Sequence, residues 1–101
     1  MTAKAIVTIV DAQVPPEREA DLLAGFERLT QEPQPDALLR SELLRGQDGA
    51  RRIQTAWRDM AALQAVRQSG KPPAALELLD SVGAQHSHGW FVIEQSFEGS
   101  H

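Results

Sequence analysis

The segment Ala5–Ala12, AIVTIVDA, constrains the fold of this chain most strongly. It is rich in β-branched residues, which favour strands. Apolar side chains occupy both sides of the extended segment, with Val7 and Ile9 on one side and Ile6 and Val10 on the other. A strand that is apolar on both faces has to be covered on both faces. We therefore predict a sheet with helices on one face and a different cover on the other.

Three segments show the signals of helices. Val14-Pro15-Pro16-Glu17 starts a helix over residues 16–30, because proline fixes φ near the helical value. Asp59 is placed to cap a second helix, which ends at Gly70. Residues 74–82 form a third, short helix with apolar residues at spacing three.

The remaining segments predict strands. Residues 37–45 (ALLRSELLR) and 50–57 (ARRIQTAW) flank Gly46-Gln47-Asp48-Gly49, which favours a hairpin turn between antiparallel strands. Propensity alone also allows a helix over 37–45, but the turn, the flanking prolines and the short length favour a strand. Residues 89–97 (GWFVIEQSF) predict the last strand, so the element order is βαββααβ.

This order is typical of the split-βαβ, ferredoxin-like layout, an α+β fold in which a four-stranded antiparallel sheet carries helices on one face. The bare face would display one side of Ala5–Ala12 and several of Leu38, Leu44, Trp57 and Trp90. Apolar faces of this size are rarely left in water. We therefore predict a homodimer whose sheets face each other, with a pocket between each sheet and its helices.

Composition excludes several classes of protein. The length of 101 residues fits one domain, residues 1–101, with a core over about residues 3–98. The chain has no cysteine, which excludes disulfides, thiol catalysis and thiolate-ligated metals. Its 10 basic and 14 acidic residues give no general attraction for nucleic acid. No segment predicts a signal peptide or a membrane anchor, so we expect a cytoplasmic protein with no nucleic-acid or membrane partner.

A tryptophan at a strand end, Trp57, is followed by Arg58-Asp59-Met60-Ala61-Ala62-Leu63-Gln64-Ala65. With the Val14-Pro15-Pro16-Glu17 entry and the βαββααβ order, this pattern resembles the antibiotic biosynthesis monooxygenase family of the dimeric α+β barrel superfamily, over roughly residues 3–98. The resemblance implies a small dimer that binds an aromatic or other hydrophobic molecule. Some members oxygenate that molecule without flavin, metal or haem, and others bind and degrade haem.

The chain departs from this family at several functional positions. It contains no asparagine and no tyrosine, which the family's oxygenases use. Val66 and Arg67 stand where many relatives carry a histidine on the second helix, including the haem ligand of the haem degraders. These departures disfavour haem degradation, and an oxygenation reaction would have to use other groups. We expect no cofactor.

Trp57 and the segment before the last strand supply candidate pocket residues. Trp57 is expected to line the pocket with its N–H free to donate, or else to be a core side chain. If the chain is extended there, His86, His88 and Trp90 share one face, and His88 or His86 could act as a base; a solvated loop is the alternative. Glu94 shares that side but lies roughly 20 Å from His88 at 3.3 Å per residue, so no metal site is predicted.

Charged and polar side chains on the middle strands supply a second candidate group. Arg40 and Glu42 share one side of their strand, as do Arg52 and Gln54. They could form a polar patch inside the barrel, where an arginine holds an enolate or carboxylate, or form surface ion pairs of little energetic value. Arg51 and Arg52 have no aromatic platform beside them, which disfavours a nucleic-acid patch.

The leading hypothesis is a cofactor-independent monooxygenase-like homodimer that binds a small aromatic or hydrophobic molecule. A non-catalytic binding or structural dimer of the same fold is one alternative. An isomerase or decarboxylase acting on an enolisable acid is another, because the same base and cation would serve it. Oxygen consumption separates the first hypothesis from both alternatives.

Overall fold

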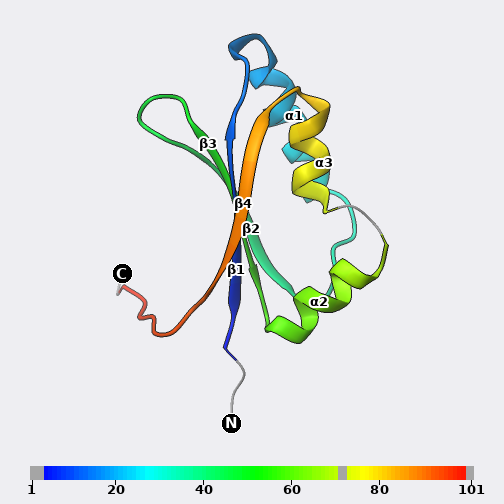
Figure 1. Cartoon of the computed structure of the whole chain (residues 1–101), viewed down its shortest axis with the longest axis vertical. Helices are drawn as coiled ribbons and strands as arrows, with labels where there is room; N and C mark the ends of the chain where they lie inside the picture. Colours follow the sequence, from blue (N-terminus) through cyan, green and yellow to red (C-terminus); the bar gives the residue numbers. More distant parts are fainter. Residues whose placement is uncertain (1–3, 71–72, 100–101) are drawn as a thin grey trace.

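The computed structural model describes residues 4–70 and 73–99, which follow the predicted βαββααβ order (Figure 1). The strands are β1 (Ile6–Gln13), β2 (Leu38–Arg45), β3 (Arg51–Trp57) and β4 (Gln85–Val92). The helices are a 3-10 turn (Pro16–Arg18) that leads into α1 (Glu19–Thr30), then α2 (Met60–Gln68) and α3 (Ala74–Ser81).

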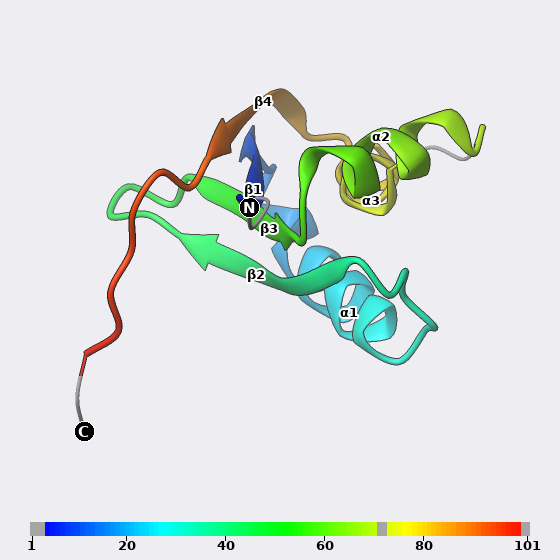
Figure 2. The same cartoon turned by 90° about the horizontal axis from the view of Figure 1, so that it is seen from below.

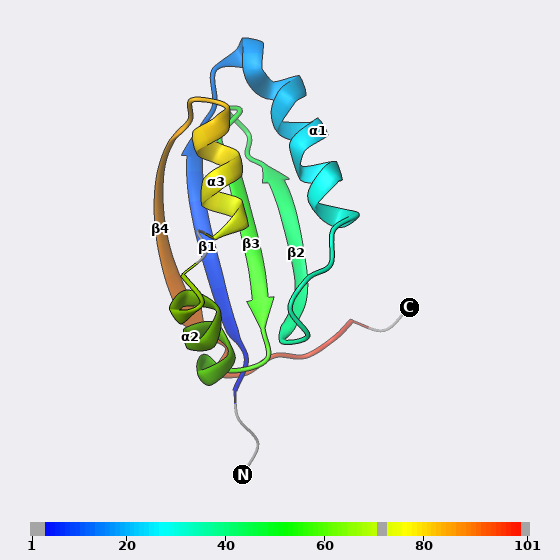
Figure 3. The same cartoon turned by 90° about the vertical axis from the view of Figure 1, so that its right-hand side faces the viewer.

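The four strands form one antiparallel sheet in the order β2-β3-β1-β4. All three α-helices lie on one face of this sheet, α1 and α3 over one end and α2 over the other (Figure 3). This is the ferredoxin-like α+β architecture predicted from the sequence. Within the described residues, no helix combines the length and the hydropathy needed to cross a bilayer.

The hairpin between β2 and β3 decides the ambiguous segment 37–45 in favour of a strand. The N–H of Gly46 donates to the carbonyl of Ala50 at 2.7 Å, and Gly49 has a φ of 81°, a conformation that glycine adopts without steric cost. Near the start of β2, a bulge between Leu38 and Arg40 shifts the register against β3. The bulge places Leu38 and Arg40 on opposite faces of the sheet.

The last strand differs from the prediction of 89–97, because it begins at Gln85 and ends at Val92. Gly83 has a φ of 71° and ends α3, so the chain turns into the sheet at once. The polar residues from Gln85 to His88 are accepted there because β4 is an edge strand. Beyond the N–H of Ile93, which bonds the carbonyl of Ala5, β1 offers no further pairing partner.

The core between sheet and helices consists of two separate clusters. The larger cluster lies under α1 and α3 and contains Val10, Ala12, Leu22, Ile53, Leu78, Leu79 and Val82. The smaller cluster lies under α2 and contains Ile6, Trp57 and Leu63. Between the two clusters, the strand register aligns one row across the sheet: Ser41, Thr55, Thr8 and Trp90. We call these four residues the central row.

The opposite face of the sheet, which we call the open face, carries no helix, and the segment after β4 runs on this side of the sheet (Figure 2). Strand alternation places Val7 and Ile9 there, while Ile6 and Val10 are buried beneath the helices. Leu44 lies on the open face as predicted, whereas Leu38, Trp57 and Trp90 face the helices. Phe91 lies on the open face beside Val7 and is 61% exposed.

Asp59 caps α2, as the sequence predicts, by accepting a hydrogen bond from the N–H of Ala62 at 2.8 Å. We expect Asp59→Ala to lower the free energy of unfolding by about 1 kcal/mol, the usual cost of losing an N-cap acceptor. Asp59→Asn keeps a capping oxygen and should unfold close to the wild type. Urea denaturation followed by circular dichroism measures both, and equal losses in the two variants would contradict the capping role.

Candidate functional site

A cavity of about 1090 Å³ lies between the sheet and the helices. Its walls come from all four strands and from the three α-helices, and it occupies the space between the two core clusters. Most of its lining is apolar, including Phe26 and Leu29 of α1 and Leu63 of α2. Its volume is at the upper end of the range of small-molecule pockets, about 300 to 1,000 Å³.

The central row provides polar groups inside this cavity. The indole N–H of Trp57 donates to the hydroxyl of Thr8 at 3.1 Å. The hydroxyls of Ser41 and Thr55 lie 2.9 Å apart and share a hydrogen bond. The Trp57 N–H is therefore not free to donate to a ligand, which corrects the sequence-based expectation. The ring of Trp57 still lines the cavity while being 9% exposed, so it is both a core side chain and part of the wall.

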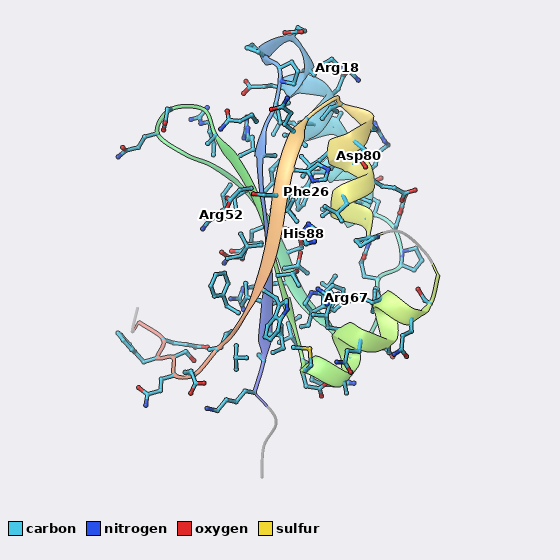
Figure 4. The ribbon with its side chains drawn as sticks, viewed as in Figure 1. Arg18, Phe26, Arg52, Arg67, Asp80 and His88 are labelled. Carbon is cyan, nitrogen blue, oxygen red and sulfur yellow. The ribbon has the colours of Figure 1, made fainter. Side chains whose placement is uncertain are left out.

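His88 and Trp90 line the cavity from β4. They lie within the strand, not in a loop, and the register with β1 puts both on the helix-covered face. Figure 4 shows His88 on the same side of the sheet as Phe26 and Arg67. The side chain of His88 forms no hydrogen bond or ion pair with any residue in the described part of the chain, so its ring nitrogens are available to a ligand.

His86 shares this face of β4 but does not line the cavity. Its Nε2 lies 2.7 Å from Oδ1 of Asp80, and its Nδ1 is buried without a partner among the described residues. The sequence analysis predicts that either His86 or His88 acts as the base. Only His88 lies at the cavity in the structure. His86 precedes it by two residues on β4 and therefore lies closer to the end of α3.

Arg40, Glu42, Arg52 and Gln54 lie on the open face, away from the cavity. The bulge in β2 moves Arg40 and Glu42 to this face, and alternation separates Arg52 and Gln54 from Trp57. The predicted anion-holding role of Arg40 and Arg52 beside His88 therefore has no geometric basis within one subunit.

The charged residues of the open face are paired there. Arg40 Nε lies 3.3 Å from Oε1 of Glu42, and Arg52 binds both carboxylate oxygens of Asp11 at 2.7 and 3.1 Å. The hydrogen bond from Arg52 lowers the pKa of Asp11 below its ordinary value. Arg51 is buried on the helix side, so Arg51 and Arg52 do not form one basic patch.

Comparisons with known proteins identify the fold. No protein-family model matches the sequence, and no curated protein matches it. SnoaB, a cofactor-independent oxygenase from Streptomyces nogalater, aligns with a TM-score of 0.64 and 19% identity over 96% of this chain and 100% of its own. A candidate antibiotic biosynthesis monooxygenase from Deinococcus radiodurans aligns with a TM-score of 0.71 and 14% identity over 95% and 99%. The chain has the antibiotic biosynthesis monooxygenase fold.

The heme-degrading protein Rv3592 from Mycobacterium tuberculosis also aligns with this chain, with a TM-score of 0.69 and 22% identity over 97% of this chain and 100% of its own. In this chain, α2 contains no histidine, and Val66 and Arg67 line the cavity where the resemblance implies the haem ligand. A guanidinium stays protonated and offers no lone pair to iron. The residues of α2 therefore do not fit haem ligation of that kind.

The sequence analysis did not predict two parts of the cavity between the sheet and the helices. One is the central row, whose signal is a single hydroxyl residue inside each apolar strand, Thr8 in IVTIV and Thr55 in IQTAW. The other is Arg67, which was considered only as a replacement for a histidine. Arg67 lines the cavity from the last turn of α2.

The hydrogen bond from Trp57 to Thr8 predicts the effect of a nearly isosteric change. Thr8→Val removes the acceptor and leaves a buried N–H unpaired, which costs about 1 to 3 kcal/mol of folding stability. Thr8→Ser keeps the hydroxyl and should lose less. Urea unfolding monitored by tryptophan fluorescence compares the two variants, and a Thr8→Val protein as stable as the wild type would show that this bond contributes nothing.

Proposed function

We propose that this protein binds a small, flat, hydrophobic molecule in the cavity and oxygenates it without a cofactor. The main support is the combination of a large apolar cavity, two tryptophans in its wall and one unpaired histidine facing it. Stacking on an indole ring favours a flat aromatic ligand. The similarity of the fold to SnoaB, a cofactor-independent oxygenase, supports the type of reaction.

In the proposed reaction, His88 is the base. It removes a proton from an acidic CH₂ group that lies between aromatic rings, which leaves a carbanion. The carbanion gives its electrons to O₂ and forms a new C–O bond, producing a peroxide anion, and the proton held by His88 converts this anion to a hydroperoxide. Loss of water then breaks the O–O bond and the remaining C–H bond of the same carbon, whose proton leaves with the departing hydroxide, and a carbonyl group remains. The net change is CH₂ + O₂ → C=O + H₂O, so the substrate supplies all the electrons.

One observation favours a non-catalytic binding protein as the second candidate. The hydroxyls of the central row are already paired, Thr8 with the indole N–H of Trp57 and Ser41 with Thr55. Preorganised donors that stabilise a developing oxyanion need to be free in the ligand-free site. On this second proposal the cavity binds the same class of molecule but does not turn it over.

Oxygen uptake with anthrone, which has an acidic CH₂ between two aromatic rings, tests the catalytic proposal. We expect uptake above the uncatalysed rate, and His88→Gln should reduce the catalysed rate by about 10²- to 10⁴-fold, the usual contribution of a general base. His86→Gln is the matched control, because His86 lies on the same strand face but is held by Asp80. Equal rates in the His88→Gln and wild-type proteins would contradict the role of His88. Anthrone binding without catalysed uptake would favour the non-catalytic candidate.

We also propose that two copies associate through the open face. Val7, Ile9, Leu44 and Phe91 give this face an apolar surface, and Phe97, which is 95% exposed, lies just beyond β4. The charges on this face are already paired within the subunit, so burying them does not leave unpaired charges. A face of this kind is rarely left in water.

Sedimentation velocity tests the homodimer directly. The wild type should sediment as a particle of twice the 11.1 kDa chain mass. Phe91→Lys replaces an exposed aromatic side chain of the proposed interface with a charge and should shift the protein to a monomer. Leu23→Lys changes a similarly exposed apolar residue on α1, on the helix side, and should leave the dimer intact. A wild-type protein that remains a monomer at high concentration would contradict the proposal.

A further inference from the structure

The cavity has an unusual distribution of charge. Arg67 and His88 are its only ionisable side chains within the described residues, and no described aspartate or glutamate lines it. The chain as a whole carries 14 acidic and 10 basic residues and a net charge of −4. The cavity therefore has the opposite sign of charge to the protein that surrounds it.

Arg67 is the source of this positive charge. It lies in the last turn of α2, and its side chain lies between α2 and the sheet, on the same side of the sheet as His88 (Figure 4). Most arginines of the chain have an acidic partner, as Arg18 with Asp21 and Arg52 with Asp11. Arg67 has none among the residues that the structure describes. Its guanidinium stays charged at every physiological pH and presents a planar set of donors.

We propose that the cavity selects a flat hydrophobic molecule that carries a carboxylate, with the guanidinium of Arg67 binding that carboxylate. This inference rests on the proposed function, because it specifies the class of molecule bound in the same cavity. Arginine binds carboxylates through two parallel N–H···O bonds, a geometry that fixes the orientation of the ligand. With the carboxylate at Arg67, the rings of the ligand extend along the apolar lining toward Trp57 and Trp90.

The surroundings of Arg67 favour a carboxylate over a phosphate. A phosphate carries up to two charges and three acceptor oxygens, which need several donors to replace water. Beside Arg67, the cavity is lined by Leu63, Ala65 and Val66 of the same helix. One guanidinium among apolar groups matches a single charge with two acceptor oxygens.

Two probes of the same shape test this inference. Naphthalene-2-carboxylate carries the charge, and naphthalene-2-carboxamide is its neutral counterpart. Both tryptophans of the chain line the cavity, so a bound naphthalene should quench or shift their fluorescence. We expect the wild type to bind the carboxylate about tenfold or more tightly than the carboxamide, as expected for a hydrogen-bonded ion pair.

Arg67→Gln should abolish this preference while leaving the affinity for the carboxamide unchanged, which also shows that the variant is folded. Arg28→Gln is the matched control, because Arg28 also lies in the last turn of a helix but does not line the cavity. It should keep the preference. Equal binding of both probes by the wild type, or an unchanged preference in Arg67→Gln, would overturn the role of Arg67 and leave the proposed binding function standing. If neither probe binds, both proposals fail.

Discussion

The packing of three short helices on a four-stranded sheet determines the rest of this structure. The helices contact the two ends of the helix-covered face, where they bury Val10 and Ile53 at one end and Ile6 and Trp57 at the other. The row between these pairs carries hydroxyls on β2, β3 and β1, and its one large side chain, Trp90, lies on the edge strand β4. No helix packs on that row, so the core is split and a cavity remains where a larger protein would have continuous packing.

The same sheet keeps two kinds of polar chemistry apart. On the open face, carboxylates and guanidiniums neutralise one another, as in the pair Asp11–Arg52, whose contact lowers the pKa of Asp11. On the helix-covered face, the hydroxyls of the central row pair with one another or with the indole of Trp57. Only His88 and Arg67 bring an ionisable group to the cavity without a partner in the described chain. The proposed catalysis and the proposed carboxylate binding are therefore assigned to these two side chains.

The element order and the fold could be predicted from the sequence, because strand and helix periodicities and the Gly46–Gly49 turn are local signals. The shared face of His86, His88 and Trp90 followed from alternation alone. Alternation could not show which face of the sheet is covered by the helices. Ala5–Ala12 is apolar on both sides, and only its pairing with β3 shows which side meets the helices. Arg40 was misplaced because the bulge after Leu38 reverses the alternation, and a bulge leaves little trace in sequence.

For the cavity, the sequence predicted Trp57, His88 and Trp90 as lining residues but not the partner of Trp57. A long-range hydrogen bond such as that between Trp57 and Thr8 joins residues 49 positions apart, and only the register brings them together.

The position of β4 has a further consequence for how a ligand would enter the cavity. The two inner strands, β1 and β3, are each hydrogen-bonded to neighbours on both sides, whereas β4 is hydrogen-bonded to β1 alone. Because elements with fewer hydrogen-bonded neighbours open at lower free-energy cost, transient fraying of the two edge strands, β4 and β2, costs less than separation of β1 from β3. Of these two strands, β4 carries His88, so fraying of β4 would also move the proposed base.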